Sequence, residues 1–335
     1  MMMSRCEGLT LVELMLALLL SLVIMAGAVS IFMASKETML LEQDLSRVQE
    51  NFRYIADRLT KDLSLVGYTG CALPFEKASA TINNRITGTS AVRDVVDGED
   101  GGSDTAPDSL TISYAKPSTG TDVLVGSGKD SNDPIYISTS TALYEALSAN
   151  FDLDESERVA IPLLVANCDG GDIFVTTGFQ HNDADDDKSP PEGVVGLKHE
   201  TGITVGGLSN AEKSFNVAYG DADLSRAKIY STEDVTYDVC TDANGDTGLC
   251  VTRGGGNREM LMPDITNFQV AYGLDSSANE DGNADRYVDW SDTISNADIT
   301  GIKVILTMVM NQVRGNDVTR TYTFIVKLRN MGLDT

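Results

Sequence analysis

The chain has 335 residues, 50 of them acidic and 25 basic, and its formal net charge is −25 at pH 7. With 42% hydrophobic residues over this length it buries a real core, which excludes a mainly disordered chain and a miniprotein held by disulfides alone. The negative charge argues against a nucleic-acid backbone as the main partner, because no net positive field attracts phosphates. Two histidines in the whole chain leave little room for imidazole chemistry.

The N-terminal segment contains an apolar run that carries no charge from Leu14 to Ser35. At ~1.5 Å per residue, this run spans the ~30 Å hydrocarbon core of a bilayer and predicts one membrane helix. A cleavable secretory signal has a shorter apolar region with basic residues in front of it, so we do not expect one here. Glu13 lies in the front end of the run, where an ionisable group is costly and therefore a functional candidate. The alternative is that Glu13 lies at the membrane interface and is tolerated there.

The segment Gly8–Met15 reads Gly-Leu-Thr-Leu-Val-Glu-Leu-Met and resembles the class III signal of type IV pilins and pseudopilins. The resemblance implies that prepilin peptidase cleaves after Gly8 and that the new first residue, Leu9, is N-methylated. Leu9 stands where the family usually has Phe. Glu13 would be the fifth mature residue, and the resemblance implies that it pairs with the N-terminal amine of a neighbouring subunit. A carboxylate and an ammonium are each costly in hydrocarbon and much less so when paired.

Beyond Lys36 the pattern becomes amphipathic, and no proline interrupts it. Apolar residues recur at spacings of three and four, which predicts one helix from about residue 9 to about residue 65. The segment Gly67–Cys71 and Pro74 would end this helix. The apolar stripe consists of Leu41, Leu45, Val48, Phe52, Ile55, Leu59 and Leu63.

Four further segments resemble the PilW family of minor pilins: Gln49-Glu50-Asn51, Gly67-Tyr68-Thr69-Gly70-Cys71, Gln269–Asp275 and Leu328-Arg329-Asn330. The resemblance implies an α+β, type IV pilin-like fold, in which a long N-terminal helix packs on an antiparallel β-sheet domain. The expected division is a prepilin leader (1–8), a membrane and assembly helix (9–35), the amphipathic half of the same helix (36–66) and a β-rich globular domain (67–335).

Short apolar runs between turn residues predict strands in the globular domain. Acidic runs at 97–104 and 182–188 indicate solvated loops, and 311–317 is the expected connection between the last two strands. The expected strands are 109–114, 135–137, 159–165, 173–177, 228–230, 264–274, 301–310 and 321–328.

The chain has five cysteines, and cleavage after Gly8 would remove Cys6 and leave four on the oxidising side of the membrane. An even number in that compartment predicts two disulfides. A local bridge between Cys240 and Cys250 needs the least rearrangement, which leaves Cys71 to pair with Cys168. The alternative is that the thiols are free and buried.

Two loops carry alternating oxygen ligands of the kind that calcium sites use. One contains Asp242, Asn244 and Asp246. The other has the relative positions 1, 3, 5, 7, 9 and 12 of an EF-hand-like loop, but Arg286 stands where glycine is expected. A solvated turn is the alternative, because Asp, Asn and Gly are also common turn formers. The ligands of the second loop would be Asp281, Asn283, Asp285, Tyr287 through its carbonyl, Asp289 and Asp292.

Catalytic motifs are absent from the sequence, so we do not expect an enzyme and expect no required cofactor. The chain has no Gly-x-Ser-x-Gly elbow, Cys-x-x-Cys or His-Glu-x-x-His pattern, and Gly126–Asp130 lacks the spacing of a phosphate loop. His181 and His199 occur in polar stretches and are expected to be exposed to solvent.

The absence of catalytic motifs and the resemblance to the PilW family together imply a non-catalytic minor pilin that helps to prime and assemble a type IV pilus, and the pilus tip is one position that the resemblance allows. Its expected partners are other minor and major pilins, prepilin peptidase and the inner-membrane assembly machinery, and no nucleic acid. It would be held in the bacterial inner membrane with its N-terminus in the cytoplasm, in agreement with Arg5, before it joins the pilus. The alternatives are a minor pseudopilin of type II secretion and a membrane-anchored periplasmic enzyme or binding protein.

Overall fold

The computed structural model describes residues 11–70, 82–87, 95–124, 133–167, 170–182, 190–215, 219, 227–254, 256–276, 282–291, 293–294, 298–313 and 316–330, and only the backbone at 310–313 and 316–318. The chain divides into two compact units. Unit 1 is Met1–Tyr54 with Val309–Arg320, and unit 2 is Ile55–Met308 with Thr321–Thr335.

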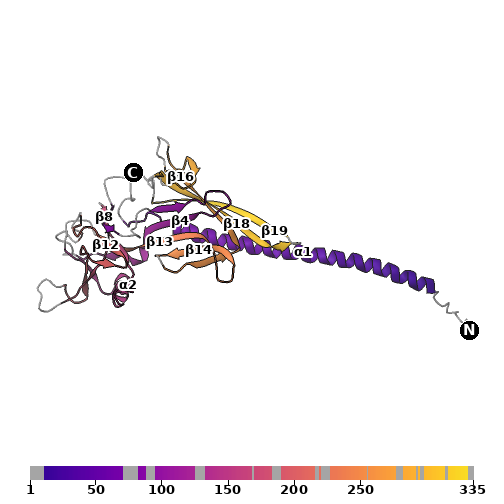
Figure 1. The fold of residues 1–335 in the computed structure, drawn as a ribbon, viewed down its shortest axis with the longest axis horizontal. Coiled ribbons are helices and arrows are strands. Elements are labelled where there is room, and N and C mark those ends of the chain that lie inside the picture. The colour runs from indigo at the N-terminus through magenta and orange to yellow at the C-terminus, as the bar shows by residue number, and fades with distance from the viewer. Residues whose placement is uncertain are drawn as a thin grey trace, which may run out of the picture. The chain divides into compact units, whose positions relative to one another are not determined.

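Helix α1 is a single helix of 53 residues, Leu11–Leu63, and Figure 1 shows its ribbon without a break. The segment contains no proline and is rich in leucine, alanine and methionine, which favour helices. Glu13 in the first turn and Lys61 in the last turn complement the helix dipole. A turn follows, in which Gly67 has a φ of 68°, a left-handed conformation that suits glycine at the end of a helix. The predicted helix is thus confirmed over its described part.

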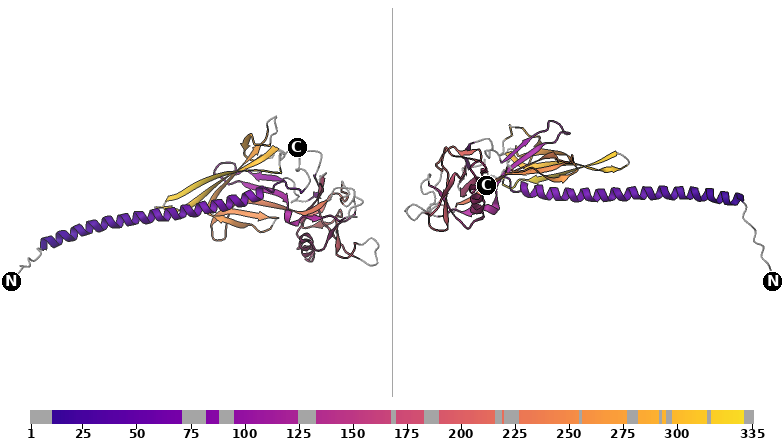
Figure 2. Two further views of the ribbon diagram at one scale, coloured as in Figure 1. Left: turned by 180° about the vertical axis from the view of Figure 1, so that it is seen from behind. Right: turned by 60° about the horizontal axis from the view of Figure 1, so that its bottom comes forward.

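The largest sheet of unit 2 has nine strands and is organised around β13 (Lys228–Thr241). Figure 2 shows the ribbon of the chain from two further sides. All the neighbours of β13 are antiparallel to it. One edge of β13 pairs first with β5 and then with β4, and the other edge pairs first with β7 and then with β14. The other strands of this sheet are β1 (Ile82–Asn84), β3 (Val96–Glu99), β4 (Ser109–Ala115), β5 (Thr121–Asp122), β7 (Pro162–Asn167), β8 (Gly170–Val175), β14 (Thr247–Arg253) and β15 (Glu259–Pro263).

Three smaller sheets complete the described strands. They have the strand orders β6-β10-β9, β11-β12-β2 and β17-β16-β18-β19. A short 3₁₀ helix, η1 (Pro117–Thr119), joins β4 to β5, and helix α2 (Ala142–Phe151) follows β6. The strands are β2 (Ile86–Thr87), β6 (Ile135–Ser138), β9 (Gly178–Gln180), β10 (Val194–Lys198), β11 (Thr204–Val205), β12 (Leu208–Asn210), β16 (Ile265–Leu274), β17 (Arg286–Val288), β18 (Ile299–Val313) and β19 (Asn316–Lys327).

The structure has a long N-terminal helix followed by a sheet-rich domain, which is the predicted α+β class, but it corrects several details. Strands β1 and β8 are parallel, and such a pair needs a long crossover, here supplied by everything between Asn84 and Gly170. Strand β3 occupies the start of the acidic run 97–104. The connection between β18 and β19 is shorter than the predicted 311–317, because β18 continues to Val313 and β19 begins at Asn316.

Helix α2 was not predicted, although its sequence carries the signals of a helix. Thr141 is its N-cap and accepts a hydrogen bond from the backbone N–H of Tyr144 at 3.3 Å. Leu143 and Leu147, four residues apart, are both buried on one face of α2. They join a core cluster that includes Phe174 of β8 and Val195 of β10.

Candidate functional site

The N-terminal part of α1 presents a continuous apolar surface. An 18-residue window within α1 has a mean hydropathy of 2.6, and none of that window is buried. Leu14, Leu18, Leu22 and Phe32 are all more than half exposed. By length and composition α1 is able to cross a membrane. An exposed apolar surface of this size requires a cover of lipid or of other helices.

Glu13 lies in the first turn of α1, next to the exposed side chains of Leu11, Val12 and Leu14. It is the only acidic residue between Leu11 and Ser35. Gly8 and Leu9, the predicted cleavage and methylation residues, lie outside the described residues. The position of Glu13 at the start of the apolar helix is the geometry that the predicted pairing with a neighbour's amine requires, and the pairing itself stays a prediction.

The C-terminal end of α1 is held in unit 2 by a buried carboxylate that the sequence analysis did not single out. Asp62 has only 6% of its surface exposed. Its Oδ2 accepts a hydrogen bond from Tyr237 Oη of β13 and another, at 2.5 Å, from Arg253 Nη2 of β14. Arg58, one turn earlier on α1, approaches the same oxygen at 3.8 Å. Apolar side chains of the same helix end, Ile55, Leu59 and Leu63, are fully buried.

Burial raises the pKa values of the tyrosine hydroxyls around Asp62. Tyr237 is fully buried, and burial, together with its hydrogen bond to the Asp62 carboxylate, raises the pKa of its hydroxyl. Tyr114 of β4 donates a hydrogen bond to Glu233 at 3.2 Å, and burial and the nearby charge of Glu233 likewise raise the pKa of its hydroxyl. Both phenols therefore stay protonated at neutral pH, and Tyr237 remains a donor to Asp62. The arrangement is a hydrogen-bonded anchor, because its phenols donate hydrogen bonds and do not ionise.

The segment that follows α1 is held by the C-terminal segment of the chain. Asn330 Nδ2 donates to the backbone carbonyls of Ser64 at 3.3 Å and Val66 at 3.0 Å. These are carbonyls that a helix end leaves without intrahelical partners. Asn330, in one segment that resembles the PilW family, thus contacts the residues directly before Gly67, where another such segment begins.

Glycine is required at position 70 because the side chain of Tyr230 approaches the backbone closely there. Its φ of 80° is left-handed, and a Cβ atom at this position would lie 2.6 Å from the hydroxyl of Tyr230 on β13. A side chain at position 70 would therefore be strained and would also displace a buried ring.

One of the two predicted disulfides lies among the described residues and is confirmed. Cys240 and Cys250 are bonded, with their Cα atoms 5.8 Å apart, across the antiparallel pair of β13 and β14. Cys71 and Cys168 lie outside the described residues, so their pairing stays a prediction.

The first predicted calcium loop forms a turn in which the carboxylate of Asp242 accepts hydrogen bonds from later residues of the same turn. Asp242 Oδ1 accepts hydrogen bonds from the backbone N–H groups of Asn244 at 2.8 Å and Asp246 at 2.9 Å. The hydrogen bond from the Asp246 backbone, followed by those from Asn244, lowers the pKa of Asp242. These donors occupy oxygens that a cation would need.

In the second calcium loop, Asp281 and Asp292 lie outside the described residues. Asn283 Oδ1 accepts a hydrogen bond from Lys327 Nζ at 3.0 Å, and Asp285 Oδ2 accepts one from the backbone of Ser276 at 2.9 Å. The other two predicted ligands are Tyr287 in β17 and Asp289 just after it. The described part of the chain contains no group of three acidic, histidine or cysteine side chains that fits a metal ion. Calcium binding at this loop stays a prediction.

Calcium binding by the second loop is a prediction that titration checks. Calorimetry of the wild-type chain should show heat at ~10⁻⁴–10⁻³ M calcium, the range of weak extracellular sites. The double variant Asp281→Ala, Asp285→Ala should show none. A wild-type chain that gives neither heat nor a higher Tm with millimolar calcium has an ordinary acidic turn at this position.

The two histidines differ in their exposure to solvent. His181 is exposed, as predicted, but the prediction that His199 is exposed is wrong, because only 2% of its surface is accessible. Its ring lies 4.2 Å from the ring of Phe215, and Nε2 donates to the carbonyl of Asp133 at 2.9 Å. Burial lowers the pKa of His199, so it is neutral at pH 7. Its polar neighbours in the sequence gave no sign of this aromatic environment.

Comparison with known families gives two matches. The family described as type IV pilus-assembly protein W (PilW) matches residues 236–331, which include Tyr237 and Arg253, the partners of Asp62, and Asn330. The prokaryotic N-terminal methylation motif matches residues 3–29, which include Gly8, Leu9 and Glu13. No curated protein and no solved structure matches the chain. The two matches, one at each end of the chain, support a type IV pilin-like protein of the PilW family, anchored in the membrane by its N-terminal helix.

Proposed function

We propose that the chain is a non-catalytic minor pilin that takes part in priming and assembly of a type IV pilus, at or near its tip. The observation that carries the proposal is the exposed apolar part of α1 with Glu13 in its first turn. A plain membrane anchor gains nothing from a carboxylate at this position. An assembly helix does gain, because the carboxylate fixes its register against a charged neighbour.

The proposed sequence of events begins in the inner membrane, with the N-terminus in the cytoplasm and the globular domain in the periplasm. Prepilin peptidase cleaves after Gly8, and Leu9 becomes the methylated N-terminal residue. Glu13 then pairs with the N-terminal amine of a neighbouring minor or major pilin as the assembly machinery moves the helix out of the lipid. The same apolar surface contacts lipid before assembly and other pilin helices afterwards. The PilW match at residues 236–331 favours a pilus over a type II secretion filament.

The variant Glu13→Ala tests the proposal. We expect normal cleavage and membrane insertion but greatly reduced incorporation into sheared filaments, because the neighbour's ammonium would be left unpaired. A cost of roughly 3 kcal/mol for an uncompensated buried charge corresponds to about a hundredfold weaker association. Quantitative immunoblots of filament and membrane fractions would measure the effect.

The matched control is Glu42→Ala, which removes an exposed acid from the same helix beyond its apolar run. This variant should assemble as the wild type does. Equal incorporation of Glu13→Ala and Glu42→Ala would contradict the pairing and with it the proposed mode of assembly.

A further inference from the structure

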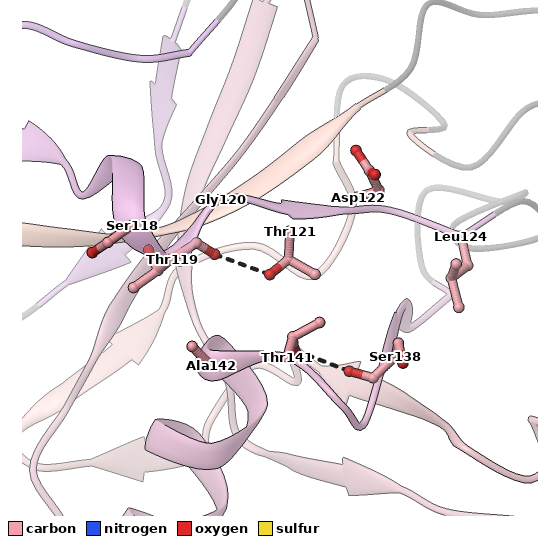
Figure 3. A pocket seen from close by; sticks show the side chains of 9 residues that line it. All are labelled: Ser118, Thr119, Gly120, Thr121, Asp122, Leu124, Ser138, Thr141 and Ala142. Carbon is pink, nitrogen blue, oxygen red and sulfur yellow. Dashed lines mark hydrogen bonds between the residues drawn. The ribbon is translucent and has the colours of Figure 1, made fainter.

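Unit 2 has a pocket of about 400 Å³ between two short stretches of chain. One wall consists of the end of η1 and strand β5, Ser118–Asp122, and continues to Leu124. The other wall consists of Ser138 at the end of β6 and Thr141 and Ala142 at the start of α2. Figure 3 shows these two walls facing each other. The volume falls within the ~300–1,000 Å³ that is common for small-molecule sites.

Hydroxyl groups dominate the lining of the pocket. Several of these hydroxyls already donate their proton to the backbone: Thr121 Oγ1 to the carbonyl of Thr119 at 2.9 Å, and Thr141 Oγ1 to that of Ser138 at 2.9 Å (Figure 3). These two oxygens are therefore fixed in position. A hydroxyl that donates its proton still has two lone pairs, and at Thr141 one of them accepts from the backbone N–H of Tyr144, which leaves the other for a ligand's donor. The five hydroxyl side chains are those of Ser118, Thr119, Thr121, Ser138 and Thr141.

The charge at the pocket is balanced. Among the described residues of the lining, Asp122 carries the one charged side chain, and its carboxylate lies 3.0 Å from the ammonium of Lys228. The ion pair thus places a charged acceptor and a charged donor side by side at the rim. An anion would meet the carboxylate of Asp122, and an apolar ligand would find two apolar side chains in the described lining, Leu124 and Ala142. A metal ion would find one carboxylate, which is too few.

The walls are held in place by the fold. Asp122 of β5 pairs with Lys228 of β13 in the ladder of the large sheet, and Thr141 caps α2. A rigid set of oxygen acceptors next to an ion pair matches a ligand that carries many hydroxyl groups, because each such group donates one hydrogen bond and accepts others. We propose that this pocket binds a neutral pyranose sugar.

Saturation-transfer NMR with the full chain tests the proposal. The chain would be held in a detergent without a sugar headgroup, and the probes would be the methyl glycosides of glucose, galactose and mannose at millimolar concentrations. At least one glycoside should receive saturation from the wild-type chain. The sugar could be a free molecule or a terminal residue of a glycan. A parallel experiment with immobilised dextran and galactomannan separates these two sources, since a pocket for terminal glycan residues retains the chain on one of these polymers and a pocket for free sugar does not.

Two variants on α2 place the binding in the pocket. Ala142→Trp would fill the space between the walls, whereas Ala146→Trp adds the same side chain at an exposed position of the same helix that does not line the pocket. The first variant should lose the transfer signal at least tenfold and the second should keep it, with the circular dichroism of both unchanged. Asp122→Ala, at a largely exposed side chain, should also weaken the signal. No transfer to the wild-type chain from any glycoside, or equal transfer in the two tryptophan variants, would overturn the proposal.

Discussion

Replacing Gly8 with valine should leave the leader on every molecule of the protein. The methylation-motif match covers this position, and the class III signal implies that prepilin peptidase cleaves after it. Glycine lets the extended chain approach the peptidase closely, and the branched side chain of valine obstructs that approach. The variant should therefore carry residues 1–8 and an unmethylated Leu9. Intact-mass spectrometry of the membrane-extracted chain reads both changes in one measurement.

The control for Gly8→Val is Glu7→Gln, which alters the neighbouring leader residue without adding bulk. We expect this variant to be cleaved and methylated as the wild type is. Identical mature N-termini in wild type and Gly8→Val would mean that the segment is not a class III signal and that α1 is an ordinary membrane anchor.

Replacing Asp62 with alanine should destabilise unit 2 by roughly 2–3 kcal/mol. The change removes the acceptor of both Tyr237 and Arg253, and a buried donor without a partner costs about 1–3 kcal/mol. The expected loss lies below the ~3–5 kcal/mol of a fully buried ion pair, because 27% of the Arg253 side chain remains exposed to water. Arg253 also keeps Glu233, at 4.0 Å, as a second partner.

Urea unfolding of the full chain in detergent micelles would measure this loss. The single tryptophan, Trp290, packs against Tyr272 with ring centroids 4.9 Å apart, so its fluorescence reports on unit 2. Tyr237→Phe, which removes one hydroxyl and keeps the ring, should lose about 1 kcal/mol. The matched control is Asp57→Ala on the same helix, because Asp57 is 64% exposed and its ion pair, with Lys61 at 2.7 Å, lies at the surface. Such exposed pairs contribute roughly 0.3–0.5 kcal/mol, and an equal loss in Asp57→Ala and Asp62→Ala would contradict the anchor.

The sequence by itself determined the features that depend on neighbouring residues. The apolar run and the stripe at spacings of three and four predicted α1, and Gly67 predicted its end, because helix formation follows local periodicity and capping. The bridge between Cys240 and Cys250 was predictable for the same reason, since only a short hairpin separates the two residues. Helix α2 was also predictable in principle from Thr141 and its leucine spacing, but the polar residues around it concealed the pattern.

Only the tertiary structure decided which polar residues are buried and which strands are neighbours. Asp62 looks in the sequence like one more acid of an amphipathic helix, and its partners Tyr237 and Arg253 lie 175 and 191 residues away. His199 is buried because Phe174 and Phe215 close around it, and its own neighbours in the sequence are polar. The sugar pocket likewise needs β5 and the start of α2 to face each other. Such contacts join residues far apart in the chain. The free energy of burial that selects them depends on the packing of the whole fold, so no local sequence pattern predicts these contacts.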